Sequence, residues 1–290
     1  MAGFVHPEFL VETGWLAEHL GDPGVVVLDG TVHLVPDPPR AYRVVSGRAD
    51  FEAGHIPGAQ FLDLQADLSD NTQKLRFMTP SAEQFAASMG RLGVGPATRV
   101  VLYSTANAWW ASRVWWLLRE FGFDNAAVLN GGFQAWVQEQ RPVETGSGTA
   151  RAAAAFPVRP RRHLMADKAE VLAAIGNGAI CTLNALRPEQ HAGSGGVSYG
   201  RPGRIAGSLN VPAAALIDPQ TNRYLPADAL RAKFDRVGAR DRQVIAYGGG
   251  GIAASADALI LTMLGHTNVR LYDASLSEWV ADASLPMETG

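Results

Sequence analysis

The residues from Val244 to Ser255 read VIAYGGGGIAAS, and they decide the fold. The first four are apolar, as in a buried parallel strand, and an apolar helical segment follows from Ala253 to Leu264. The four glycines between them allow a turn in which backbone N–H groups converge beside the positive end of a helix. Such a turn holds an anion or stabilises a thiolate. We therefore expect a strand–turn–helix unit with an anion cradle at residues 248–253.

The same order of segments occurs twice along the chain. Residues 54–59, GHIPGA, recur in related form as residues 203–208, GRIAGS. Residues 142–146, PVETG, recur as residues 286–290, PMETG. Between these marks each half carries an apolar strand, a helix, a second apolar strand and a shorter helix. This alternation indicates parallel βαβ units, and a repeat of this length indicates a duplicated domain.

We therefore predict an α/β fold of two tandem domains, each a mainly parallel sheet flanked by helices on both faces. The N-terminal domain is placed at residues 1–146, the linker at 147–160 and the C-terminal domain at 161–290. The linker is predicted from small polar residues followed by two prolines, which interrupt regular structure.

Composition narrows the function classes. The chain has 290 residues, of which 47% are hydrophobic, so two domains with buried cores are possible. A net charge of -3 gives no general attraction to nucleic acid or to anionic membranes. No apolar run reaches the roughly 18 residues that span a bilayer, and no secretory leader is recognisable, so we expect a soluble, cytoplasmic protein. The single cysteine, Cys181, excludes a multi-cysteine metal site, and we predict neither a metal nor a cofactor.

Several segments resemble the rhodanese family of tandem-domain thiosulfate and 3-mercaptopyruvate sulfurtransferases. Residues 48–59 resemble its first signature, residues 199–212 resemble the second-domain copy, and residues 276–290 resemble its closing segment. The loop at 248–253 resembles its active-site loop, in which a cysteine after an aromatic strand end carries sulfur as a persulfide. The resemblance implies that the N-terminal domain is the structural copy and that substrate binds between the domains.

The resemblance places Gly248 at the position of the catalytic cysteine. Glycine has no group that can form a persulfide. Cys181 lies in an apolar strand, so we expect it to be a core residue. Ser104, in the matching loop of the first domain, has no histidine nearby in sequence to act as its base. The chain therefore has no recognisable nucleophile.

The candidate ligand-binding residues surround this loop. They are Gly249, Gly250, Gly251, Ile252 and Ala253 for backbone amides, with Arg187, Arg204 and His33 for side chains. The loop itself has no lysine or arginine, so positive charge has to come from its surroundings. Arg187 either binds an anion or begins a helix, and Arg204 either anchors a turn or orients the ligand. Around His33 and residues 105–110 we expect the opposite wall, with Trp109 or Trp110 beside the cleft.

Three functions remain open. The first is a diverged protein that binds a small ligand, either an anion or a sulfur compound, or a protein partner, without persulfide chemistry. The second is an enzyme of changed chemistry in the same interdomain cleft, with proton transfer by Tyr247, Ser255 or His33. The third is a sulfurtransferase whose cysteine was removed by mutation. Fold alone does not choose among them.

Overall fold

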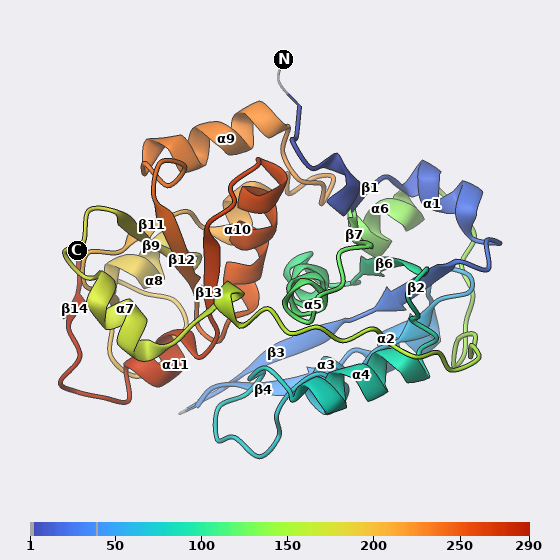
Figure 1. Ribbon diagram of the computed structural model, residues 1–290, viewed down its shortest axis with the longest axis horizontal. Helices are drawn as coiled ribbons and strands as arrows, with labels where there is room; N and C mark the ends of the chain where they lie inside the picture. Colours follow the sequence, from blue (N-terminus) through green and yellow to red (C-terminus); the bar gives the residue numbers. More distant parts are fainter. Residues whose placement is uncertain (1–2, 39) are drawn as a thin grey trace.

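The computed structural model describes residues 3–38 and 40–290. It consists of two α/β domains that lie side by side (Figure 1), the first running from blue to green and the second from yellow to red. Within the described residues, no helix is both long enough and apolar enough to span a bilayer.

The N-terminal domain is built on a five-stranded parallel sheet in the order β1-β7-β6-β2-β5. Its strands are β1 (Leu10–Val11), β2 (Val25–Asp29), β5 (Gln60–Phe61), β6 (Arg99–Tyr103) and β7 (Ala126–Leu129). Its helices are η1 (Pro7–Phe9), α1 (Thr13–His19), α2 (Arg48–Ala53), α3 (Leu64–Asp67), α4 (Ala82–Arg91), α5 (Trp109–Glu120) and α6 (Gly132–Gln138).

The C-terminal domain repeats this plan with the order β8-β13-β12-β9-β11. Its strands are β8 (Met165–Ala166), β9 (Ile180–Asn184), β11 (Leu209–Asn210), β12 (Gln243–Tyr247) and β13 (Val269–Tyr272), with a separate antiparallel pair of β10 (Arg204–Ile205) and β14 (Met287–Glu288). Its helices are η2 (Arg162–Leu164), α7 (Lys168–Ala174), α8 (Pro188–Ala192), η3 (Ala213–Leu216), α9 (Ala227–Arg236), α10 (Ile252–Met263) and α11 (Ser275–Trp279).

Both faces of each sheet are covered by helices. In β2, Val25 and Val27 belong to one apolar cluster with residues of α1, α2 and α6, whereas Val26 and Leu28 belong to another with residues of α4 and α5. In β12, Val244 packs with α9 and α10, whereas the next residue packs with α7 and α11. Alternating side chains of fully buried strands produce this division. The expected fold class of two tandem α/β domains is confirmed.

Helices α5 and α10 join the two domains. All twelve residues of α10 are buried, and α5 is buried from Trp110 to Leu118 and again at Glu120. Helices buried on nearly every side lie within a protein core rather than at its surface. The two helices pack against each other, and a single apolar cluster therefore continues from the first sheet to the second.

A β-hairpin distinguishes the first domain from the second. Strands β3 (Val32–Asp37) and β4 (Arg40–Ser46) form an antiparallel pair between β2 and α2. Between β9 and α8, the matching place in the second domain, the chain has only residues 185–187. The hairpin runs beneath α5 toward the C-terminal domain (Figure 1), where the Tyr42 ring lies 6.5 Å from that of Tyr199. Sequence analysis did not predict this hairpin.

The segment from residue 150 to residue 160 crosses between the domains without a helix or strand. It lies against the N-terminal domain, because Ala154 N–H donates to the Gly90 carbonyl (2.9 Å) and Arg159 N–H donates to that of Phe121 (2.8 Å). These bonds fix the path of the chain into the second domain.

Candidate functional site

The glycine loop connects β12 to α10 and is held from below by α11. The Ser275 Oγ accepts hydrogen bonds from the N–H groups of Gly248 (3.0 Å) and Gly251 (3.1 Å). The Gly249 carbonyl accepts bonds from the backbone N–H (3.0 Å) and the hydroxyl (2.6 Å) of Ser277. The N–H groups of Gly249 and Gly250 donate to no other group of the described residues. These two amides are therefore available to a ligand at the N-terminal end of α10.

The glycines of the loop differ in what they require. Gly251 caps α10 with a φ of 75°, in the left-handed region that disfavours other residues. At Gly249 a β-carbon would lie 1.9 Å from the Tyr199 hydroxyl, so only glycine fits without movement. At Gly248 a β-carbon would meet its nearest neighbours, Ala253 and Leu186 among them, at 3.7–3.8 Å, an ordinary contact distance. The backbone thus accepts a side chain at position 248.

A cavity of about 700 Å³ lies between the domains above this loop. One wall comes from the loop and from α8, and the other from the β3–β4 hairpin and from residues 106–110. Its polar and aromatic lining includes His33, Tyr42, Trp109, Arg187, Glu189 and Tyr199. Because both domains and the hairpin contribute, the cavity exists only in the folded two-domain chain.

The cavity offers several hydrogen-bond donors. The Trp109 Nε1 is buried and has no partner among the described residues. Arg187 is exposed, and its side chain makes no ion pair with a described residue, although Glu189 lies in the same wall. His33 Nε2 is hydrogen-bonded to the Asp50 carboxylate. Together with the free amides of the loop, these groups suit a small anion whose remaining surface is apolar or aromatic.

The structure brings together six of the nine site residues named from the sequence. His33, Arg187, Gly249, Gly250, Ile252 and Ala253 line the cavity. Gly248, Gly251 and Arg204 do not belong to its lining. Gly248 lies at the loop entrance, and Gly251 packs against Asp273. Arg204 pairs with Glu288 (3.4 Å) and donates to the Gly290 carbonyl (2.6 Å), so it holds β10 against the C-terminal strand.

The other polar residues considered from the sequence have structural partners. The buried Tyr247 hydroxyl bonds with Ser208, Asn184 and the Ile205 N–H. Ser255 is buried and donates to the Ile252 carbonyl (2.6 Å). Ser104 donates to the Asn107 carbonyl (2.9 Å). None of these three lines the cavity.

Cys181, the only cysteine of the chain, lies in the core. It pairs in register with Val244 in the middle of the second sheet, and it is 1% exposed. Burial raises the pKa of its thiol, which disfavours the reactive thiolate. The expected role in core packing agrees with this placement.

Equivalent polar groups hold the strand ends of both domains. The Asp29 carboxylate, at the end of β2, accepts bonds from the backbone and hydroxyl of Thr31. Burial raises its pKa to about 6, although these hydrogen bonds oppose the shift. Asn184 takes the same place in the second sheet and accepts a bond from the Leu186 N–H (2.8 Å). Both residues shape loops, as their positions after strands predict.

An ion pair behind the loop crosses the domain boundary. Arg113 of α5 is fully buried, and its Nη1 lies 2.6 Å from the Asp273 Oδ1. The other Asp273 oxygen accepts bonds from the N–H (2.7 Å) and hydroxyl (2.9 Å) of Thr79. A β-carbon on Gly251 would lie 2.8 Å from Asp273, so this pair is in contact with the loop.

Sequence reasoning missed three residues of the site. Tyr42 lies on the unpredicted hairpin, and Tyr199 lies in a glycine-rich segment with no periodic pattern. Ser275 has a positive φ of 52°, which nothing in its neighbourhood predicts. The one available signal was the position of Tyr199 at the start of the second-domain signature.

Comparison with known proteins supports the duplication. The Rhodanese-like domain profile matches residues 12–139 and again residues 168–282. The 3-mercaptopyruvate sulfurtransferase of Escherichia coli K12 is 34% identical over 288 residues, covering 97% of this chain and 98% of that protein. The sulfur carrier protein TtuD of Thermus thermophilus is 30% identical over 303 residues, covering 99% of each.

A solved structure gives the same result. The crystal structure of SseA from Escherichia coli, a 3-mercaptopyruvate sulfotransferase with the rhodanese fold, superposes with a TM-score of 0.81 at 31% identity, covering 93% of this chain and 99% of that one. Each profile match covers one of the two five-stranded sheets except for its first short strand, and the relatives align over almost the whole chain. The chain therefore belongs to the rhodanese-like domain family, as a member with two tandem domains.

Proposed function

We propose that this rhodanese-family chain binds a small anionic ligand in the interdomain cavity without forming a persulfide at residue 248. The observation that carries the proposal is the chemistry of the loop. Gly248 has no side-chain thiol or hydroxyl, while the neighbouring N–H groups of Gly249 and Gly250 have no acceptor among the described residues. The single cysteine is buried in β9, away from the cavity lining.

The donors around the cavity favour a carboxylate or a sulfur oxyanion. These donors are the two loop amides and the exposed Arg187 guanidinium, which come from two different segments of the second domain. Each well-aimed hydrogen bond contributes on the order of 1 kcal/mol, and the helix end contributes a similar amount. The relatives named above act on or carry sulfur compounds according to their names, which supports the same ligand class.

Binding is tested by thermal unfolding in the presence of thiosulfate, sulfite and small 2-oxo acids. A ligand at about 100 times its Kd adds roughly 2.7 kcal/mol to the free energy of unfolding. We expect stabilisation by at least one of these compounds, and loss of that stabilisation in Arg187→Ala. Arg204→Ala is the matched control, since Arg204 does not line the cavity. If no compound stabilises the chain, the proposed ligand class is wrong.

The chemical half of the proposal is tested by activity. The purified chain should transfer no sulfur from thiosulfate to cyanide, or from 3-mercaptopyruvate to a thiol. The variant Gly248→Cys should form a persulfide detectable by mass spectrometry, because a β-carbon fits at this position. Turnover by the unmodified chain that persists in Cys181→Ala would contradict the proposal. Full restoration of turnover by Gly248→Cys would instead favour a sulfurtransferase whose cysteine was removed.

A second candidate function rests on His33. Its imidazole lines the cavity and is hydrogen-bonded to Asp50, an arrangement that orients a general base. Chemistry of this kind would be proton transfer on a bound acid rather than sulfur transfer. Deuterium exchange at the carbon next to the carbonyl of a bound 2-oxo acid, lost in His33→Gln and kept in His19→Gln, would identify it.

A further inference from the structure

A second cavity lies on the other side of Tyr42 and Tyr199. It has a volume of about 520 Å³, and its lining includes Tyr42, Lys74, Arg76, Ser198, Tyr199 and Ser277. We call it the basic chamber. The two tyrosine rings meet edge to face at 75° and also line the interdomain cavity. They therefore form a wall shared by the two cavities.

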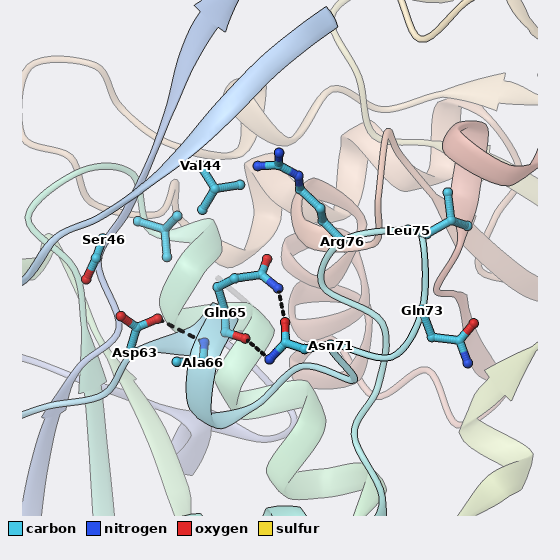
Figure 2. Close-up of a pocket in the computed structure, with 10 residues that line it drawn as sticks. Val44, Ser46, Asp63, Gln65, Ala66, Asn71, Gln73, Leu75 and Arg76 are labelled. Carbon is cyan, nitrogen blue, oxygen red and sulfur yellow. Dashed lines mark hydrogen bonds between the residues drawn. The ribbon is translucent and has the colours of Figure 1, made fainter.

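Two cationic side chains line the basic chamber, and one of them, Arg76, also lines the neighbouring cavity together with Asp63. Lys74 and Arg76 are exposed, and neither pairs with an acidic side chain of the described residues. No aspartate or glutamate belongs to the lining. Figure 2 shows the Arg76 side chain extending toward Val44 of the hairpin, at the edge of a neighbouring cavity. In the interdomain cavity, by contrast, Arg187 shares its wall with Glu189.

Arg76 is close enough to act on the shared wall. Burial raises the pKa of Tyr42, and the positive charge of Arg76 opposes that shift. The phenol therefore stays protonated at neutral pH and can donate a hydrogen bond. Ser277 joins the chamber to the loop, because its hydroxyl donates to the Gly249 carbonyl. A ligand in the chamber would thus contact side chains that touch the glycine loop.

We propose that the basic chamber binds a multivalent oxyanion, either a phosphate-bearing or a polycarboxylate small molecule, as a second ligand of the chain. Two cations separated by one residue, with phenol and serine hydroxyls beside them, match several negatively charged oxygens better than one. The site is separate from the interdomain cavity, so the proposal does not depend on what that cavity binds.

The test is calorimetric titration of the full chain with inorganic pyrophosphate and, separately, with citrate. We expect saturable binding of at least one, weakened about tenfold in Lys74→Ala and in Arg76→Ala, and further in the double variant. Both residues are exposed, so the variants should fold, which their thermal unfolding checks. Lys233→Ala on α9 removes the same charge elsewhere and should leave the affinity unchanged. Binding of pyrophosphate alone identifies a phosphoryl ligand, and binding of citrate alone a polycarboxylate.

Arg187→Ala separates the two sites. If affinity for these probes falls in Arg187→Ala and persists in the Lys74/Arg76 double variant, the anion binds in the interdomain cavity and the chamber proposal is overturned. It is equally overturned if the wild-type chain binds neither probe, or if Lys233→Ala weakens binding as much as Arg76→Ala. Loss in the double variant with retention in Arg187→Ala supports the chamber, whatever the outcome of the thiosulfate and 2-oxo acid experiments.

Discussion

At the scale of single residues, the glycines of the loop are under different structural constraints. Gly251 has a positive φ and contacts Asp273, whereas Gly248 has neither constraint. We expect Gly251→Ala to lower the free energy of unfolding by about 1–3 kcal/mol, because of backbone strain and the close carboxylate. Gly248→Ala should change it by less than about 1 kcal/mol. Urea unfolding of both variants measures these changes. Equal losses of unfolding free energy would show that positions 248 and 251 are equally constrained.

The buried carboxyl of Asp29 predicts a pH dependence of stability. Its pKa is raised from 3.8 to about 6, so between these values the folded chain holds a proton that the unfolded chain has released. Stability therefore falls as pH rises from about 4 to about 6, and stays constant above. Asp29→Asn should remove this loss and gain up to about 3 kcal/mol over the wild type at pH 7.

The second domain supplies the control for this prediction. Asn184 occupies the matching strand end, and Asn184→Asp should introduce the pH dependence that Asp29→Asn removes. Unfolding in urea at pH 4, 5, 6 and 7 measures both. A constant difference between Asp29→Asn and the wild type across this range would mean that the Asp29 pKa is not raised.

Residue roles were predictable where a residue ended or followed a strand or held a position of the repeat. Asp29 and Asn184 end apolar strands and Arg187 follows three residues after the second of these, so their places near the loops follow from the sheet. The role of Tyr199 depends on a contact with Gly249, fifty positions further on, which no local pattern encodes. Arg204 takes the repeat position of His55, and it pairs with Glu288 as His55 pairs with Glu144, so the anchoring role followed from the repeat.

At the scale of elements, the glycine loop depends on α11 for its shape. The Ser275 Oγ accepts two loop N–H groups and donates to the Tyr272 carbonyl (2.8 Å). Ser275→Ala leaves two buried amides unpaired, so we expect a loss of about 1–3 kcal/mol in stability together with weaker ligand binding. Ser284→Ala, at an exposed turn in the same domain, is the control. Unchanged thiosulfate or 2-oxo acid binding in Ser275→Ala would show that the cradle forms without its support.

The regular elements were predictable because their apolar residues repeat with a clear period. The expected helix at 253–264 is α10, which begins and ends one residue earlier. The β3–β4 hairpin was not predicted because apolar and polar residues alternate only partly in its strands and its connection contains prolines. It also has no counterpart in the second domain, so the repeat gave no hint of it. The second wall of the cavity was missed for this reason.

At the scale of the whole molecule, the Arg113–Asp273 pair couples the domains beside the loop. Asp273→Asn leaves the fully buried guanidinium without its counter-ion, and removing one partner of a buried pair costs about 3–5 kcal/mol. We expect a loss of this size, and a smaller one in the double variant Arg113→Met/Asp273→Asn, because the unpaired guanidinium is then removed as well. The buried Glu120 lies in the electrostatic range of both residues, so part of the loss should remain in the double variant. Urea unfolding followed by tryptophan fluorescence measures both. If the double variant loses as much as the two single variants added together, the pair does not act as a unit.

The enclosed helices α5 and α10 have a consequence for dividing the chain. Because the protein consists of two copies of one domain, a natural experiment is to divide the chain at residue 147 and to express each domain alone. Each half would then expose to water the side of α5 or α10 that the other helix covers, and most of that side belongs to the apolar cluster shared by the domains. Such halves should be recovered as aggregates when expressed apart and as a soluble heterodimer when expressed together. Each of the two duplicated domains therefore needs the other in order to stay soluble.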